Sequence, residues 1–206
     1  MGAFIVFEGG EGSGKSTQAR VLFRRLQREG YRVMLTHEPG GTPLGEAARR
    51  WLKSRRGTEA LAELFLFMAA RAQLVRQVLR PALERGEVVV CDRFGASTVA
   101  YQGYGRGLDL ELIHQLNRWA TGGLFPDLTV LLDVPVEVGM GRKAKPGNDV
   151  FEGAGLEFHR RVREGYLAQA RQEAQRWLVV DGARPRREVA EEVWQRVEPL
   201  VKGTRQ

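Results

Sequence analysis

Short hydrophobic runs alternate along the chain with longer segments in which apolar residues recur every three or four positions. Five runs predict β-strands, over 3–8, 32–36, 87–91, 128–133 and 177–180. Runs such as Val88–Val90 and Val130–Leu132 are apolar at every position, which is typical of parallel strands covered on both faces. The segments between the runs predict helices over 15–29, 44–54, 59–85, 109–121, 154–175 and 185–201. The alternation therefore predicts a doubly wound α/β fold, a five-stranded parallel sheet flanked by helices.

Nothing along the 206 residues divides the chain into separate folding units. It contains no internal repeat, low-complexity tract or linker rich in proline and serine, so we expect a single domain over residues 1–206. Gly30 and Gly86 stand at expected helix C-caps, and Asp109 stands at an expected N-cap. Segment 143–153 lacks apolar periodicity and predicts a mobile surface loop, which makes the region of about 142–153 a candidate lid.

Several features bear on the compartment in which the protein works. No apolar stretch reaches the roughly 18 residues that a transmembrane helix needs. The first residues run directly into a strand without the basic region of a signal peptide. Cys91 is the single cysteine, and its position after Val88–Val90 predicts a buried, unreactive thiol. We therefore expect a soluble, cytoplasmic protein.

The formal net charge of +7 raises the question of a nucleic-acid partner. The arginines, however, occur as scattered pairs, mostly in predicted helices beside glutamates, which is typical of solvated helix faces with local ion pairs. The pairs are Arg24-Arg25, Arg49-Arg50, Arg55-Arg56, Arg160-Arg161 and Arg186-Arg187. We favour this interpretation over attraction of anionic nucleotides, and both over nucleic-acid binding. No nucleic-acid or membrane partner is therefore expected.

A glycine-rich segment from Gly9 to Thr17 contains Gly-x4-Gly-Lys-Ser between the first strand and the first helix. Glycines allow main-chain N–H groups to turn towards an anion, and the helix N-terminus adds partial positive charge. Lys15 is expected to reach the β- and γ-phosphates, Ser16 to hold Mg²⁺, and Thr17 to donate to the α-phosphate. The other residues expected around the phosphates are Gly10, Glu11, Gly12, Ser13 and Gly14. The motif predicts a nucleoside triphosphate site and leaves the acceptor open.

A Mg²⁺ site of this kind needs a carboxylate at the end of a neighbouring strand. Asp92 and Asp133 both follow apolar strands. Asp92 precedes Arg93, which would place an anion-binding guanidinium at the same edge of the sheet, so we assign Asp92 to the metal, through water. Asp133 is expected to be structural or to lie in the outer shell. The three histidines show no metal-ligand spacing and are expected to be structural.

Four further phrases accompany the phosphate-binding loop: Glu38-Pro39-Gly40-Gly41, Phe67-x3-Arg71, Asp92-Arg93 and Tyr101-Gln102-Gly103. In this order, from Phe4 to about Pro185, the sequence resembles the bacterial thymidylate kinases. The loop alone occurs in many families, whereas the combination is much more specific. The resemblance implies a P-loop kinase of the nucleoside monophosphate type that transfers phosphate from ATP to dTMP. It also implies a homodimer formed by helices around 59–85 and 95–121.

The resemblance further implies roles for residues on the acceptor side. Phe67 would stack on the thymine ring, Arg71 would hydrogen-bond the base or its neighbourhood, and Arg93 would bind the 5′-phosphate. Thr98 and Gln102 would read the base edge, while Tyr101 would crowd the 2′ position of the sugar. Structural alternatives remain open: a core aromatic for Phe67, a surface ion pair for Arg71, and helix packing or capping for Thr98 and Tyr101.

Other implied roles concern the reacting groups and the donor. Glu11 would contact the 3′-hydroxyl or support the Mg²⁺ shell, and Glu38 would orient that site. Arg142 would begin the lid. The turn from Asp181 to Pro185 resembles the loop that contacts adenine, chiefly through its backbone, which places Ala183 beside the base.

An acceptor that is already an anionic phosphate needs no general base, so positioning and positive charge carry the expected mechanism. Lys15, Arg93 and Glu11 are its expected catalytic residues. The resemblance implies a further cation either in the loop or in the lid. Because the variable loop positions contain no arginine, it implies that Arg142 or Lys145 of the lid reaches the γ-phosphate. The family phrase Asp-Arg-Phe-Glu reads Asp-Val-Phe-Glu here, over 149–152. Other P-loop nucleotide or nucleoside kinases, a nucleotide-dependent switch and a nucleic-acid-binding ATPase are the alternatives.

Overall fold

The computed structural model describes residues 2–54, 59–142 and 154–204. Within them, one parallel sheet has the strand order β2-β3-β1-β4-β5. The strands are β1 (Phe4–Glu8), β2 (Val33–His37), β3 (Val88–Asp92), β4 (Leu128–Asp133) and β5 (Trp177–Asp181). Each strand end lies within one residue of its predicted position. The predicted α/β fold with a five-stranded parallel sheet is therefore confirmed.

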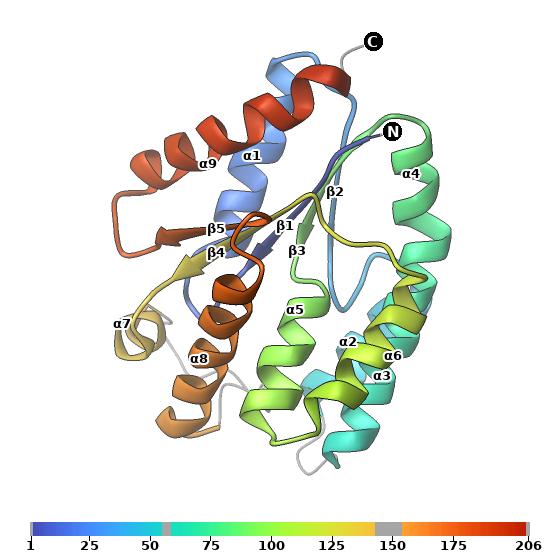
Figure 1. Cartoon of the computed structure of the whole chain (residues 1–206), viewed down its shortest axis with the longest axis vertical. Coiled ribbons are helices and arrows are strands. Elements are labelled where there is room, and N and C mark those ends of the chain that lie inside the picture. Colours follow the sequence, from blue (N-terminus) through green and yellow to red (C-terminus); the bar gives the residue numbers. More distant parts are fainter. Residues whose placement is uncertain (1, 55–58, 143–153, 205–206) are drawn as a thin grey trace.

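The helices cover the two faces of this sheet (Figure 1). They are α1 (Lys15–Arg28), α2 (Pro43–Ser54), α3 (Ala60–Leu74), η1 (Val75–Leu79), α4 (Arg80–Glu84), α5 (Gly95–Thr98), η2 (Val99–Gly105), α6 (Leu110–Thr121), α7 (Val136–Gly141), α8 (Leu156–Gln172), α9 (Arg186–Val201) and η3 (Lys202–Thr204). The helix predicted over 59–85 is present as α3, η1 and α4, with a π-helical segment in its middle. Gly30 and Gly86 follow helix ends with positive φ, and Asp109 accepts a hydrogen bond from the Leu112 N–H at 2.7 Å. The predicted N-cap at Asp109 is confirmed, whereas the two C-caps are Glu29 and Arg85, each one residue before the predicted glycine.

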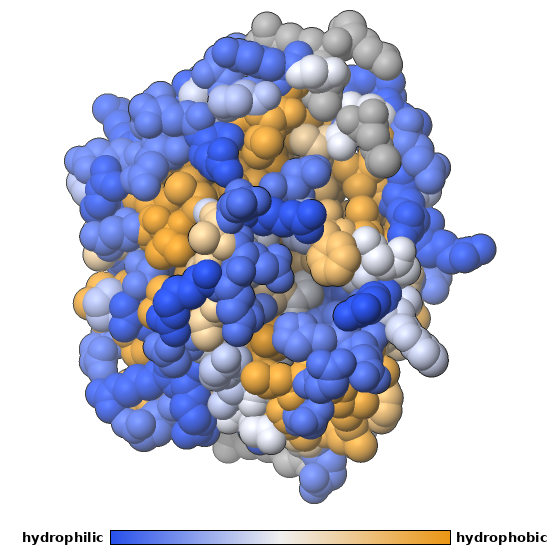
Figure 2. Space-filling view, viewed as in Figure 1, coloured by the Kyte–Doolittle hydropathy of each residue, from blue (hydrophilic) through white to orange (hydrophobic). Residues whose placement is uncertain are grey.

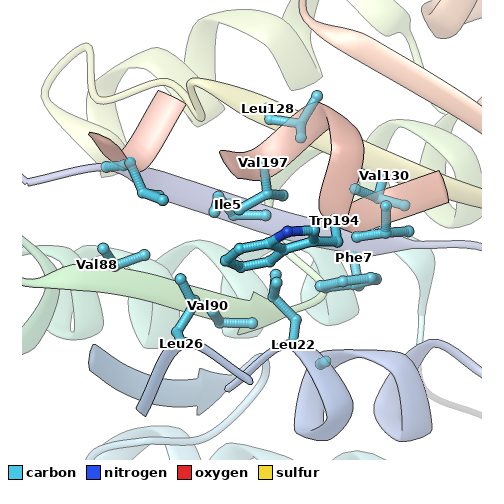
Figure 3. Packing of buried hydrophobic residues seen from close by; sticks show 14 of the residues in the cluster. Ile5, Phe7, Leu22, Leu26, Val88, Val90, Leu128, Val130, Trp194 and Val197 are labelled. Atoms are coloured by element: carbon cyan, nitrogen blue, oxygen red, sulfur yellow. The ribbon is translucent and has the colours of Figure 1, made fainter. Parts of the chain in front are cut away.

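Alternating residues of the central strands divide the core between the two faces. Ile5 and Phe7 of β1 pack with residues of α1 and α9, including Leu22 and Trp194 (Figure 3). Phe4 and Val6 point the other way, into a cluster with η1 and α4. Both faces are thus buried, which is why these strands read as continuous apolar runs.

The helical segments α5–η2 and α7 lie outside the predicted helices, and the prediction is corrected there. Gly95, Gly103 and Gly105 weaken any local helical signal in α5–η2. The segment is held by tertiary contacts, because the buried Glu8 carboxylate accepts hydrogen bonds from the N–H groups of Phe94 and Ser97 at its start. Those contacts bring Thr98, Tyr101 and Gln102 to the carboxyl ends of the strands.

Two expectations about the chain as a whole can be compared with the structure. Cys91 is fully buried, and its thiol donates to the Arg93 carbonyl at 3.0 Å. Burial also raises the pKa of this thiol well above its ordinary value, which confirms the expected unreactive cysteine. None of the helices in the described part of the chain is long and apolar enough to cross a bilayer.

Candidate active site

The glycine-rich loop joins β1 to α1 and wraps around the N-terminus of that helix. Gly12 and Gly14 have φ angles of 67° and 91°, a left-handed conformation that side chains disfavour. A Cβ at Gly12 would lie 1.9 Å from the Gly139 carbonyl oxygen of α7. The loop therefore needs glycine at this position both for its backbone angles and for its close approach to α7.

Lys15 lies at the start of α1 and folds back over the loop. Its ammonium donates to the Gly10 carbonyl oxygen at 2.9 Å, and its side chain is largely buried. Burial first, and then the positive charge of Arg93, lower the pKa of Lys15 to about 8, although Glu11 and Asp92 oppose the shift. The loop thus holds a lysine whose charge a bound anion would stabilise.

Ser16 and Asp92 bring two oxygen ligands together beside the loop. The Ser16 hydroxyl donates to Asp92 Oδ2, and Asp92 Oδ1 is buried with no hydrogen-bond partner among the described residues. Asp133, by contrast, is held by Arg163 through two hydrogen bonds of 2.6 and 2.7 Å. No cluster of three or more metal-ligating side chains occurs in the described part of the chain. The Ser16–Asp92 pair suits a divalent cation that takes its remaining ligands from phosphates and water.

Arg93 occupies the centre of a polar network at the carboxyl end of β3. Its φ of 71° is unusual for a residue with a side chain, and such strain often marks functional positions. The guanidinium donates to Glu11 Oε1 at 2.7 Å and to the hydroxyl groups of Tyr101 and Tyr166 at 3.1 Å. Arg93 therefore already holds one carboxylate oxygen at the mouth of the glycine-rich loop, in the manner expected for a phosphate oxygen.

Arg71 is almost fully buried, and its five N–H donors are all engaged. Nε and Nη2 both donate to Glu38 Oε2, and Nη2 also donates to the Phe94 carbonyl oxygen. Nη1 donates to the Thr98 hydroxyl and to the Asn117 side-chain oxygen. Burial raises the pKa of Glu38 although the Arg71 charge opposes the shift, and Glu38 Oε1 has no partner among the described residues. In this arrangement a ligand could use Arg71 only by displacing one of these partners.

A cavity of about 600 Å³ joins the loop to the network around Arg93. It therefore brings the triphosphate-binding motif and the acceptor-side phrases to one site. The predicted site residues that line it are Glu11, Gly12, Gly14, Lys15, Ser16, Thr17, Glu38, Phe67, Arg71, Asp92, Arg93, Thr98, Tyr101, Gln102 and Arg142.

Comparison with known proteins agrees with this geometry. A profile of the family described as thymidylate kinase matches residues 7–193. The chain belongs to the thymidylate kinase family. A thymidylate kinase of Thermomicrobium roseum is 50% identical, over 100% of this chain and 99% of its own. One of Deinococcus radiodurans is 53% identical, over 94% of this chain and 95% of its own. The crystal structure of thymidylate kinase from Ehrlichia chaffeensis is similar at a TM-score of 0.80 and 36% identity, covering 95% of this chain and 98% of that one. The predicted family is confirmed.

The remaining predicted residues of this thymidylate kinase family member lie elsewhere. Gly10 and Ser13 line a small cavity of about 20 Å³ behind the loop. Ala183 lies in the turn after β5, where its N–H donates to Asp181 Oδ1 at 2.8 Å. Arg142, which also lines the larger cavity, reaches the same turn and donates to the Gly182 carbonyl at 2.9 Å. Lys145, with the rest of segment 143–153, lies outside the described residues.

Sequence reasoning missed several residues of the site. Arg49 was assigned to a solvated arginine pair, but it lines the cavity and donates to the Pro39 carbonyl at 3.2 Å. Tyr166 accepts a hydrogen bond from Arg93 at 3.1 Å, and its own hydroxyl donates to Glu8 Oε2 at 3.0 Å. Nothing in the sequence marks Tyr166, because α8 lies far along the chain.

Proposed function

We propose that the protein transfers the γ-phosphate of ATP to dTMP, giving dTDP and ADP. The observation that carries this proposal is the cavity that Lys15 and Arg93 both line. Two cationic groups on different elements suit two phosphorylated ligands, one held in the loop and the other at Arg93. A switch or binding module would need only the first of these sites.

The donor is proposed to lie along the loop and the turn after β5. Main-chain N–H groups and Lys15 would hold its phosphates, while Ala183 would border the adenine. The Arg142–Gly182 hydrogen bond supports this, because it joins the residue that precedes segment 143–153 to the turn. Ser16 and Asp92 would hold Mg²⁺, which would supply positive charge to the β- and γ-phosphates when bound.

The acceptor is proposed to lie between α3 and η2. Phe67 would stack on the thymine, Thr98 and Gln102 would face its edge, and Tyr101 would limit space at the sugar. Arg71 is proposed to act mainly by orienting Glu38 and Thr98, because its donors are engaged. Glu11 would release Arg93 when a phosphate oxygen replaces its carboxylate, and would then be available to the 3′-hydroxyl.

No general base is needed in this mechanism, since the attacking phosphate oxygen is already ionised. Lys15 and Arg93 would align donor and acceptor and stabilise the charge on the transferred group. Arg142 or Lys145 would add a further cation and exclude water. We also propose a homodimer in the cytoplasm, without nucleic acid or membrane as partners.

An exposed apolar surface supports the homodimer. Hydrophobic residues gather over the lower right of the face in Figure 2, where Figure 1 places α3 and α6. The exposed large hydrophobic residues of these helices are Leu61, Phe65, Leu110, Leu112 and Trp119. Exposed apolar side chains gathered on one face are typical of subunit contacts, and sedimentation equilibrium should give twice the monomer mass.

The proposed reaction is tested by measuring ADP production with ATP and Mg²⁺ against dTMP, dUMP, dCMP, AMP and thymidine. We expect dTMP to be the preferred acceptor and chromatography to show dTDP. Phosphorylation of thymidine but not dTMP would indicate a nucleoside kinase instead. ATP hydrolysis that no acceptor changes would indicate a nucleotide-dependent switch.

ATP binding should take up a proton at alkaline pH. Because the pKa of Lys15 is lowered to about 8, the lysine is charged at pH 7 and mostly neutral at pH 9 before nucleotide binds. Phosphate would restore the charged form, so affinity should fall by up to about tenfold per pH unit above 8. Calorimetry in buffers of different ionisation enthalpy should show close to one more proton taken up at pH 9 than at pH 7. Equal proton uptake at the two pH values would contradict the proposed contact.

A further inference from the structure

A buried carboxylate holds the amide of Gln102 in one orientation. Glu63 and Gln102 are each 1% exposed, and Gln102 Nε2 donates to Glu63 Oε1 at 2.8 Å. Arg106 donates to the other oxygen, Oε2, at 3.2 Å and supplies the charge that pairs with this carboxylate. Both oxygens of the buried Glu63 carboxylate thus accept hydrogen bonds, one from Gln102 and the other from Arg106.

The direction of the hydrogen bond follows from the chemistry of the partner. An ionised carboxylate only accepts, so it can pair with the NH₂ end of an amide but not with the oxygen end. The opposite orientation would place two acceptors together in a buried site, which is costly. Gln102 Oε1 is consequently left as an acceptor, and no donor among the described residues contacts it.

The pair lies directly beside the proposed base site. Gln102 lines the cavity from η2, and Phe67 lines it from α3. Glu63 is one helical turn before Phe67, so that the two residues share a face of α3. Tyr101 and Gln102 both lie in the π-helical segment η2 and both line the cavity, and π-helical segments often occur at functional sites.

We propose that Glu63 is a positioning residue that sets base specificity by presenting Gln102 to the ligand as an acceptor. This inference rests on the proposed function. An acceptor pairs with the N3–H of thymine or uracil, whereas N3 of cytosine is itself an acceptor and would oppose Oε1. The pair therefore selects a pyrimidine that carries an imide N–H, and leaves the 5-methyl group to other contacts.

The test is Glu63→Gln, which preserves shape but can either donate or accept. Gln102 could then turn its NH₂ group towards the cavity. We expect the ratio of kcat/KM for dTMP to kcat/KM for dCMP to fall about tenfold, the size of one hydrogen bond. The fall should arise from a higher KM for dTMP at nearly unchanged kcat, because the lost contact is made equally before and during transfer.

Glu59→Gln is the matched control, since it makes the same change at an exposed position one turn earlier on the chain. Glu59→Gln should leave the dTMP-to-dCMP ratio of kcat/KM within about twofold of the wild-type ratio. Thermal unfolding should show that both variants are folded. A folded Glu63→Gln variant with the wild-type ratio would overturn the inference. If wild-type protein instead transfers phosphate to no pyrimidine monophosphate, the proposed function itself fails, and the two results are distinguishable.

A measurement on the wild type covers the case in which Glu63→Gln does not fold. In NMR spectra of ¹⁵N-labelled protein, one glutamine side-chain NH₂ group should exchange slowly with water. Its signal is assigned to Gln102 if it is absent from the spectrum of Gln102→Met. Such protection is expected only when the NH₂ end is buried against Glu63. Fast exchange of the Gln102 amide would reject the fixed orientation.

Discussion

Replacing Arg93 by glutamine should lower kcat/KM for dTMP about a thousandfold while ATP affinity changes by no more than about threefold. Each hydrogen bond to a charged group contributes roughly 1.5–3 kcal/mol. Two such bonds from one guanidinium to a phosphate give about 4 kcal/mol, and every 1.4 kcal/mol corresponds to tenfold. The kcat/KM of Arg93→Lys for dTMP should lie between those of the wild type and Arg93→Gln, because lysine keeps the positive charge but loses the planar pair of N–H donors. Steady-state kinetics with dTMP varied at saturating ATP measure the effect.

The same variant offers a second readout on the donor side. The positive charge of Arg93 helps to lower the pKa of Lys15, so Arg93→Gln should raise that pKa. Proton uptake on ATP binding at pH 9 should then become smaller. Arg80→Gln is the control, because Arg80 bonds the carbonyls of Thr121 and Gly122 and does not line the cavity. An Arg93→Gln protein with wild-type kcat/KM for dTMP would refute the proposed acceptor site.

The sheet and the phosphate-binding loop could be predicted because their signals are local. Strands buried on both faces must be apolar at nearly every position, as in Val88–Val90, and a loop that wraps an anion must contain glycine at fixed spacing. The acceptor-side phrases were also local, since each follows a strand or occupies one helix turn. They identified Phe67 and Arg93 as cavity residues before any contact was known.

The parts that sequence could not supply depend on contacts between distant elements. The helix α5–η2 has weak local propensity and depends on the Glu8 carboxylate at its start. Asp92 and Asp133 end the two strands that flank β1, so topology alone did not separate them. In the structure, Arg163 of α8 holds Asp133 through two hydrogen bonds, a contact between distant elements that the sequence does not show. The complete engagement of Arg71 likewise depends on four separate segments, including Asn117 of α6.

Replacing Gly12 by alanine should weaken ATP binding at least about a hundredfold. The φ of 67° at this position costs a residue with a Cβ roughly 1–2 kcal/mol. The Cβ would also lie 1.9 Å from the Gly139 carbonyl oxygen and 2.7 Å from its carbon, so the loop or α7 must move. Either movement would turn main-chain N–H groups away from the phosphates, which they bind by position alone. Titration with a fluorescent ATP analogue measures the loss.

Gly139→Ala separates the close contact from the backbone angle. Gly139 does not have a positive φ, yet its Cβ would lie 2.4 Å from the Glu11 carbonyl oxygen on the opposite side of the same contact. If the approach of α7 shapes the loop, Gly139→Ala should also weaken ATP binding, by about tenfold or more. Gly141→Ala is the control, since a Cβ at that position of α7 meets no atom within 4 Å. If Gly139→Ala binds ATP with wild-type affinity, the loss in Gly12→Ala arises from the backbone angle at Gly12 and not from the contact with α7. If ATP binding weakens in Gly139→Ala but not in Gly141→Ala, then α7, the helix that precedes segment 143–153, sets the geometry of the phosphate site.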